Sequence, residues 1–202
     1  HEMDYRLKKL DVRSTKSRLR GAMTFAVGGP VLQVKDVDLL ADPVDFDLLR
    51  TLNGRAFPVD WQGQLRGTVV ARGGPLTHFV VDTSHLVFQD AHVPGASSEV
   101  SGRGELDILQ PAFTVFHHFR VEATTIDLRT IEYLYPDFPA LAGTLSGVAT
   151  LDSSWMDVRF SDADVTQRVP LAPPSRILGS GRITYGDTSM TYDASLFADS
   201  LS

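Results

Sequence analysis

Apolar and polar residues alternate along much of the chain with a period of two. In residues 19–27 every second residue is apolar or glycine, and Arg20 and Thr24 are among the residues between them. Residues 100–108 and 177–185 keep the same alternation. This period is typical of strands with one buried and one solvated face. The pattern therefore predicts a mainly β fold built from long antiparallel strands.

The chain also repeats itself at a spacing of roughly 80 residues. Residues 17–25, 98–106 and 175–183 align without gaps, and residues 61–69 align with residues 141–149 at the same spacing. We therefore predict one continuous elongated domain made of two repeats and the start of a third. Its expected divisions are residues 1–16 as the end of a preceding repeat, 17–97 as repeat 1, 98–174 as repeat 2 and 175–202 as the start of repeat 3.

Glycine recurs on the apolar face of the expected strands, for example at Gly21, Gly67, Gly147 and Gly179. Glycine inside a strand weakens it and marks a bend, a bulge or the close approach of another group. Its repetition on one face predicts a sheet that curls toward its apolar side into a U-shaped, taco-like trough with an apolar groove. The alternation also changes parity near Lys35, where we expect a bulge.

Two short segments depart from the strand pattern and predict one short helix in each repeat. Residues 43–52 have early acidic residues and apolar residues three and four apart, and residues 125–134 have the same plan behind Thr125 as the cap. The alignment of the repeats pairs Asp47 with Asp127. Further strands are expected at residues 31–34, 79–81, 86–88, 113–123, 156–160 and 190–196.

The composition is that of an average globular or repeat protein, with 43% hydrophobic and 22% charged residues. The net charge of -6 disfavours a nucleic-acid partner, because phosphate binding needs concentrated Lys and Arg. The absence of cysteine excludes disulfides, thiolate metal sites and a cysteine nucleophile. No apolar stretch reaches the roughly 18 residues of a membrane-spanning helix. Because the chain begins at His1 and shows no signal-peptide segment, we expect it to be a piece of a longer or processed protein.

Candidate catalytic and metal-binding residues lack the spacing that such sites need. In a regular strand His117 shares a face with Phe119 and Val121 while His118 faces the other way, so one metal ion cannot easily take both histidines. Three further histidines, spaced by seven residues, also change face at each step: His78, His85 and His92. The acidic pairs lack a calcium-loop pattern, and the glycine clusters lack phosphate-loop or nucleophile-elbow patterns. We therefore expect no enzyme activity, no metal and no cofactor.

The repeated apolar face is the strongest remaining signal. An apolar trough with polar rims suits an acyl chain, which is long, unbranched and apolar. The same alternation would line the closed interior of a β-sandwich, so the alternative is a structural or adhesive interaction module without a ligand groove. A hydrolase with unrecognised sites is a third hypothesis. The candidate groove residues are Leu19, Met23, Phe25, Val27, Leu65, Val69, Val100, Leu106, Ile108, Leu145, Ile177, Ile183 and Tyr185.

The order of several short motifs supports a family resemblance. Ser-Arg-Leu-x-Gly (residues 17–21) precedes Asp-Val-Asp-Leu (36–39), then Asp-Leu-Leu (47–49, with Asp-Leu-Arg at 127–129), Phe-Pro and Gly-x-Leu-x-Gly (63–67). This order resembles the repeats of the AsmA-like superfamily, in particular its TamB-type translocation and assembly proteins. The resemblance covers nearly the whole chain.

The resemblance implies a protein of the periplasm or cell envelope, part of a longer membrane-anchored chain, whose curled β-sheet has a hydrophobic groove. It implies a role in bridge-like phospholipid transport or outer-membrane biogenesis. The implied partners are phospholipid acyl chains, adjoining repeats of the same chain and an outer-membrane β-barrel assembly protein. The family has no catalytic residues to transfer. We therefore expect a lipid-transport or envelope-assembly protein that shields acyl chains in its groove.

Overall fold

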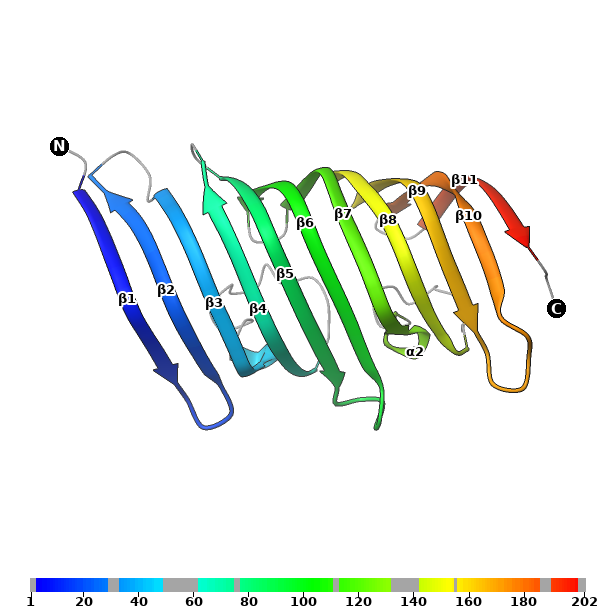
Figure 1. The fold of residues 1–202 in the computed structure, drawn as a ribbon, viewed down its shortest axis with the longest axis horizontal. Helices are drawn as coiled ribbons and strands as arrows, with labels where there is room; N and C mark the ends of the chain where they lie inside the picture. The colour runs from blue at the N-terminus through cyan, green and yellow to red at the C-terminus, as the bar shows by residue number, and fades with distance from the viewer. Residues whose placement is uncertain are drawn as a thin grey trace.

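The computed structural model describes residues 3–28, 33–48, 62–74, 77–110, 113–131, 142–154, 156–185 and 190–199. These residues form the strands β1 (Met3–Arg13), β2 (Arg18–Val27), β3 (Gln33–Asp45), β4 (Gly63–Gly73), β5 (His78–Asp90), β6 (Ser97–Gln110), β7 (Phe113–Asp127), β8 (Thr144–Ser154), β9 (Asp157–Arg168), β10 (Ser175–Tyr185) and β11 (Met190–Asp199). Each strand pairs antiparallel with the next, so the order in the sheet is the order in the sequence (Figure 1). The predicted mainly β fold is confirmed. The described strands form one open sheet instead of the two packed sheets of a sandwich.

Bulges explain where the strands differ from the simple alternation. The expected strands at residues 79–81 and 86–88 are parts of one strand, β5. A bulge separates them, since the pairing of β5 with β6 skips two residues between Val81 and Ser84. The bulge expected near Lys35 is confirmed, since the pairing of β3 with β2 leaves this residue out. A bulge shifts the alternation, so apolar side chains on both sides of it stay on one face.

The helical segments begin later than the sequence predicts. Residues 46–48 are helical after β3, and α2 (Leu128–Ile131) follows β7. The backbone N–H of Arg129 donates to Asp127 Oδ1 at 3.1 Å, so Asp127 caps this helix. The expectation that Thr125 is the cap is therefore wrong. Residues 43–45 and 125–127 of the predicted helices belong to strands β3 and β7 instead. Residues 49–52 and 132–134 and the Phe-Pro turns lie outside the described residues.

The same hydrogen bond, from an aspartate backbone N–H to a serine hydroxyl, precedes each helical segment; we call it the Ser–Asp joint. The backbone N–H of Asp45 donates to Ser17 Oγ at 2.9 Å, and the backbone N–H of Asp127 donates to Ser98 Oγ at 3.1 Å. Asp45 therefore corresponds to Asp127, and the alignment of Asp47 with Asp127 is wrong by two residues. Each expected repeat contains two strands, a helical segment and two further strands. The division of the chain into repeats stays a prediction.

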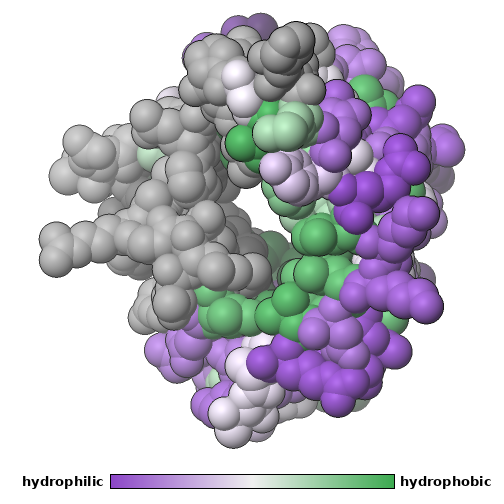
Figure 2. All heavy atoms as spheres, turned by 90° about the vertical axis from the view of Figure 1, so that its left-hand side faces the viewer, coloured by the Kyte–Doolittle hydropathy of each residue, from purple (hydrophilic) through white to green (hydrophobic). Residues whose placement is uncertain are grey.

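The sheet curls toward its apolar face. The view along its long axis from the β1 side (Figure 2) shows hydrophobic residues on the inner side of the curve and hydrophilic residues on the outer side. Inside the even-numbered strands from β2 to β10 lie glycines with φ between +132° and +158°: Gly21, Gly67, Gly104, Gly147 and Gly179. A Cβ at Gly67 would collide with the backbone carbonyl oxygen of His85, so glycine is needed for this close approach of β4 and β5.

Candidate apolar binding face

Residues directly opposite one another on neighbouring strands form rows across the sheet. Two rows of the inner face are apolar throughout, whereas others contain a few polar residues such as Ser84 and Gln167. The central row crosses all eleven strands without a polar residue. Its members are Val12, Leu19, Ala41, Gly67, Leu86, Val100, Ala123, Gly147, Val165, Ile177 and Ala198. Because side chains alternate between the two faces of a strand, the whole row points to the inner side of the curl.

A second row, separated from the central row by one row that includes the polar Ser84, is also apolar on every strand. Its members are Leu7, Met23, Val37, Ala71, Val81, Gly104, Phe119, Leu151, Phe160, Gly181 and Ala194. Between β6 and β7 this row passes through a bulge, where the Phe119 ring lies against Gly102. A Cβ on Gly102 would come within 2.6 Å of that ring. Glycine therefore makes room for an aromatic side chain on the inner face.

The predicted groove residues lie on the inner face, apart from Tyr185, whose side chain is outside the described part of the chain. Members of the central and second rows are Leu19, Val100, Ile177 and Met23. Residues of the flanking rows are Phe25, Leu65, Val69, Leu106, Leu145 and Ile183. These residues are half-buried, whereas Val27 and Ile108 are exposed at 40% and 41%.

The inner face is packed at its centre and open toward its edges. Ala71, Val81 and Phe119 are buried there, and six half-buried residues pack against them: Val37, Val69, Leu106, Phe116, Val121 and Leu151. Near the β1 edge, the rings of Phe25 and Tyr5 stack with centroids 5.5 Å apart, and Tyr5 remains 45% exposed. None of the large side chains described is fully buried. The exposed apolar side chains of this face therefore lie on the edge strands and at strand ends, for example Leu7, Val12 and Leu196.

The outer face is charged, and its ion pairs join neighbouring strands. Arg72 of β4 makes two hydrogen bonds to Asp82 of β5, at 2.6 and 3.0 Å. Arg176 of β10 binds Asp164 of β9 in the same way, at 2.7 and 2.8 Å. The hydrogen bonds from Arg176 keep the pKa of the Asp164 carboxyl below its usual range. Because exposed ion pairs each contribute little to stability, packing on the inner face matters more for the fold.

Two histidines far apart in the sequence share one carboxylate on the outer face. His78 Nδ1 lies 2.9 Å from Asp107 Oδ1, and His117 Nε2 lies 2.8 Å from Asp107 Oδ2. The hydrogen bonds from His117 and then His78 hold the pKa of the Asp107 carboxyl below its usual range, against the opposing effect of burial. Among the described residues, no group of three His, Cys, Asp or Glu side chains is arranged to hold a metal ion. The cluster therefore links β5, β6 and β7 through hydrogen bonds.

The expectation that His117 shares the inner face with Phe119 and Val121 is wrong. His118 has φ +49°, and the pairing of β7 with β8 skips both histidines before it resumes at Phe119. Because of this bulge both histidines turn outward, and His118 Nδ1 lies 3.1 Å from Asp152 Oδ1. Sequence reasoning missed the bulge because the parity of the apolar residues from Phe119 onward reads as a regular strand.

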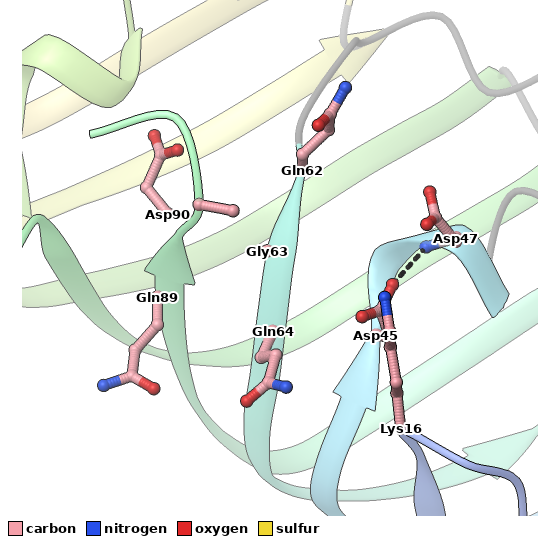
Figure 3. Close-up of a pocket in the computed structure, with 9 residues that line it drawn as sticks. Lys16, Asp45, Asp47, Gln62, Gly63, Gln64, Gln89 and Asp90 are labelled. Atoms are coloured by element: carbon pink, nitrogen blue, oxygen red, sulfur yellow. Dashed lines mark hydrogen bonds between the residues drawn. The ribbon is translucent and has the colours of Figure 1, made fainter. Parts of the chain in front are cut away.

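A polar pocket of about 480 Å³ lies beside the ends of β3, β4 and β5 (Figure 3). Its lining residues are Lys16, Asp45, Asp47, Gln62, Gly63, Gln64, Gln89, Asp90 and Ala91. In this pocket the backbone N–H of Asp47 donates to Asp45 Oδ1 at 3.0 Å. The buried Asp90 accepts the backbone N–H of His92 at 2.7 Å and so holds the turn after β5. The pocket mixes charges and amides, which suits water better than an acyl chain.

Comparison of the chain with models of known protein families, with curated proteins and with solved structures gives no match. In the part of the chain that the structure describes, no helix has both the length and the apolar character needed to span a membrane. A function for this protein therefore has to rest on the geometry and chemistry of its own surfaces. Its inner face carries two rows of apolar residues that cross all eleven strands.

Proposed function

We propose that the inner face of the curled sheet is a hydrophobic groove that shields phospholipid acyl chains during transport or envelope assembly. The observation that carries this proposal is the central row, which crosses eleven strands without a polar residue. At a spacing of about 4.8 Å between strands, the row extends over about 50 Å, which exceeds the ~30 Å hydrocarbon core of a bilayer. A track of this length suits a long apolar ligand.

A lipid in this groove is held by partition between water and the apolar face. Each buried methylene gains about 0.8 kcal/mol relative to water. Because neighbouring positions along the central row are chemically alike, a lipid can move from strand to strand without meeting a deep energy minimum. Small residues of the row, such as Ala41, Gly67 and Gly147, leave space above the sheet for the chain. The direction of transport must come from another part of the system.

The proposed setting is the periplasm or cell envelope, where this segment would be part of a longer membrane-anchored protein. The two edge strands support an extension of the groove by adjoining repeats. Inner-face residues are exposed on both edges, with Leu7 of β1 at 39% and Tyr192 of β11 at 76%. Unpaired edge strands accept a further strand readily. An outer-membrane β-barrel assembly protein is the proposed partner beyond these repeats.

The proposal is tested with a matched pair of substitutions on adjacent residues of β4. Val69 is half-buried on the inner face, whereas Thr68 is exposed on the outer face. The purified protein is analysed by native mass spectrometry and lipid extraction. Val69→Arg is expected to lose co-purified phospholipid, because an unpaired charge in the groove makes acyl-chain burial unfavourable. Thr68→Arg adds the same charge outside the groove and is expected to keep the lipid.

Circular dichroism of both variants separates loss of lipid from loss of fold. Leu106→Arg, which places a charge on the same face of β6, is expected to behave like Val69→Arg. Phospholipid retained at the wild-type level by a folded Val69→Arg variant contradicts the proposal. A wild-type protein that is stable, monomeric and free of lipid would instead favour the alternative, an interaction module without a ligand groove.

A further inference from the structure

Two turns of the chain share one sequence pattern and one hydrogen bond. The turn between β5 and β6 reads Val-Pro-Gly-Ala (residues 93–96), and the turn between β9 and β10 reads Val-Pro-Leu-Ala (residues 169–172). In each turn the alanine N–H donates to the carbonyl oxygen of the valine three residues earlier, at 2.9 and 3.2 Å. The two turns follow the last strand of repeat 1 and of repeat 2, so they are equivalent in the expected repeats.

Both turns have the geometry of a type II turn, but they differ at the position that defines it. Proline at the second position holds its own φ near −65°, and the third residue has φ +82° at Gly95 and +68° at Leu171. A type II turn needs a positive φ at this third position, which favours glycine or asparagine. Gly95 meets this need without strain, whereas Leu171 holds a conformation that leucine avoids.

No packing contact of the described residues compensates for this strain at Leu171. Leu171 is fully exposed, and residues 170–174 are exposed throughout. A solvent-exposed leucine in a left-handed conformation is therefore unfavourable twice, once in its backbone and once in its side chain. A strained and exposed residue that no packing contact explains motivates the search for a contact outside the chain.

The chemistry of the loop around Leu171 suits an environment of low polarity. Residues 169–174 carry no charge, and three of the six are prolines, which have no backbone N–H. The N–H of Ala172 is bonded within the turn. Because an unpaired N–H is costly to remove from water, this loop loses less than an ordinary turn when it enters a lipid interface. The equivalent loop of repeat 1 has Asp90 and His92 just before its turn.

The geometry points to the loop at residues 169–174 as a docking knob for a lipid bilayer, with Leu171 inserted at the boundary between headgroups and acyl chains. Its prolines hold the knob in one conformation, so little conformational entropy is lost on docking. The exposed Arg168 at the base of the loop provides a cation for lipid phosphates. One knob gives weak and reversible attachment. This surface is separate from the groove, so the inference goes beyond the proposed function.

The test is the partition of the purified protein onto phosphatidylcholine vesicles, measured by co-sedimentation. Leu171→Gly converts the second turn into a copy of the first and is expected to weaken partition about tenfold, which corresponds to about 1.4 kcal/mol. The melting temperature of this variant is expected to stay equal or to rise, because glycine relieves the positive φ. Leu171→Met keeps an apolar side chain and is expected to keep vesicle binding.

A fluorescent label reports where the loop lies. The chain has no cysteine, so an environment-sensitive dye can be attached at Ala172→Cys alone, with Thr15→Cys in the exposed β1–β2 turn as the control. The dye at residue 172 is expected to shift its emission to the blue on vesicle addition, while the dye at residue 15 is not. Equal partition of wild type and Leu171→Gly, or a wild type that does not bind, overturns the proposal. The second result would favour a protein pocket as the site that receives Leu171.

The knob and the groove can fail independently. Loss of vesicle binding in Leu171→Gly with co-purified lipid unchanged supports the knob and leaves the groove intact. Loss of co-purified lipid in Val69→Arg with unchanged vesicle binding shows that the loop docks to vesicles without the groove, as proposed.

Discussion

The two expected repeats, residues 17–97 and 98–174, agree in their backbone joints and differ in the side chains around them. In both, a serine hydroxyl accepts the N–H of the aspartate that ends the second strand. In both, a glycine of positive φ lies inside the third strand, at Gly67 and Gly147. The chemistry then diverges, because the second residue after the capping aspartate is Asp47 in one repeat and Arg129 in the other.

This difference separates two kinds of position. The Ser–Asp joints pair a backbone N–H, and the inner glycines avoid a collision with a carbonyl oxygen of the next strand. These requirements of the backbone are the same in every repeat that folds this way. Turn tips and the outer face carry few such demands, so their side chains are free to differ. The exposed Leu171, which stands where the first repeat has Gly95, is the clearest example.

The largest effect is expected at the shared glycines. Gly67→Val and Gly147→Val would each drive a Cβ into a backbone carbonyl oxygen of the next strand, that of His85 or of Asp164, and both positions have positive φ. Each substitution is expected to lower the free energy of unfolding by about 3 kcal/mol or more, and the two effects should be similar. Urea denaturation followed by circular dichroism measures both.

Gly95 is the matched control for these glycines. It also has positive φ, but a Cβ placed there meets no atom within 4 Å. Gly95→Asn is therefore expected to change stability by less than about 1 kcal/mol, since asparagine tolerates this conformation. A clear difference between Gly67→Val and Gly147→Val would break the equivalence of the two repeats at this position.

A smaller effect is expected at the capping aspartates, where the repeats differ. Asp127 accepts two side-chain hydrogen bonds from Arg129, at 2.6 and 2.9 Å, in addition to its capping bond, whereas Asp45 caps through the N–H of Asp47. Near pH 7, Asp127→Ala is expected to cost about 2 kcal/mol and Asp45→Ala about 1 kcal/mol. Thermal and urea unfolding of both variants measure this difference.

The pH dependence of stability tests the contribution of Asp127 further. The side-chain hydrogen bond from Arg129 keeps the pKa of Asp127 below its usual value in the folded state. A carboxyl with a lowered folded pKa contributes its stability fully above the unfolded value of about 3.9, and this contribution is lost as the pH falls through the folded pKa. The deficit of Asp127→Ala relative to wild type is therefore expected to shrink below about pH 4. A deficit that is constant from pH 7 to pH 2 would contradict the ionic part of this bond.

The smallest effect is expected on the outer face. Arg72→Ala and Arg176→Ala each remove one exposed cross-strand ion pair, with Asp82 or with Asp164. Solvent and salt screen such pairs, so neither substitution is expected to shift the urea midpoint measurably at physiological ionic strength. A large loss of stability in either variant would mean that the outer face holds the curl together, and the contrast between the two faces would fail.

Much of the inner face could be predicted from the sequence, because the period of two fixes which residues of a regular strand share a face. Leu19, Val100 and Ile177 were aligned as equivalents and lie in one row across the sheet. The bulge at Lys35 was also predictable, since it shows as a change of parity in the sequence. The outward turn of His117 was not, because Phe113 and Val115 have the same parity as Phe119 and hide the change from Phe116 to Phe119.

The helical segments show a second limit. Local spacing indicated helices from residue 43 and from residue 125, but strand pairing extends β3 and β7 further and delays both helical starts. Hydrogen bonds to a neighbouring strand satisfy the backbone over these residues, and local helix preference is weak beside them. The caps are therefore the last residues of strands, Asp45 and Asp127.

Local patterns in the sequence specify the strands, the apolar face and the glycines that allow the curl, because each follows from the chemistry of one residue and its near neighbours. Tertiary structure alone decided which residues meet across strands. The unbroken central row, the Asp107 cluster and the capping joints all depend on register, and register is set by bulges and by pairing along the whole sheet. A one-residue shift reverses the face of every side chain, so local patterns cannot decide it.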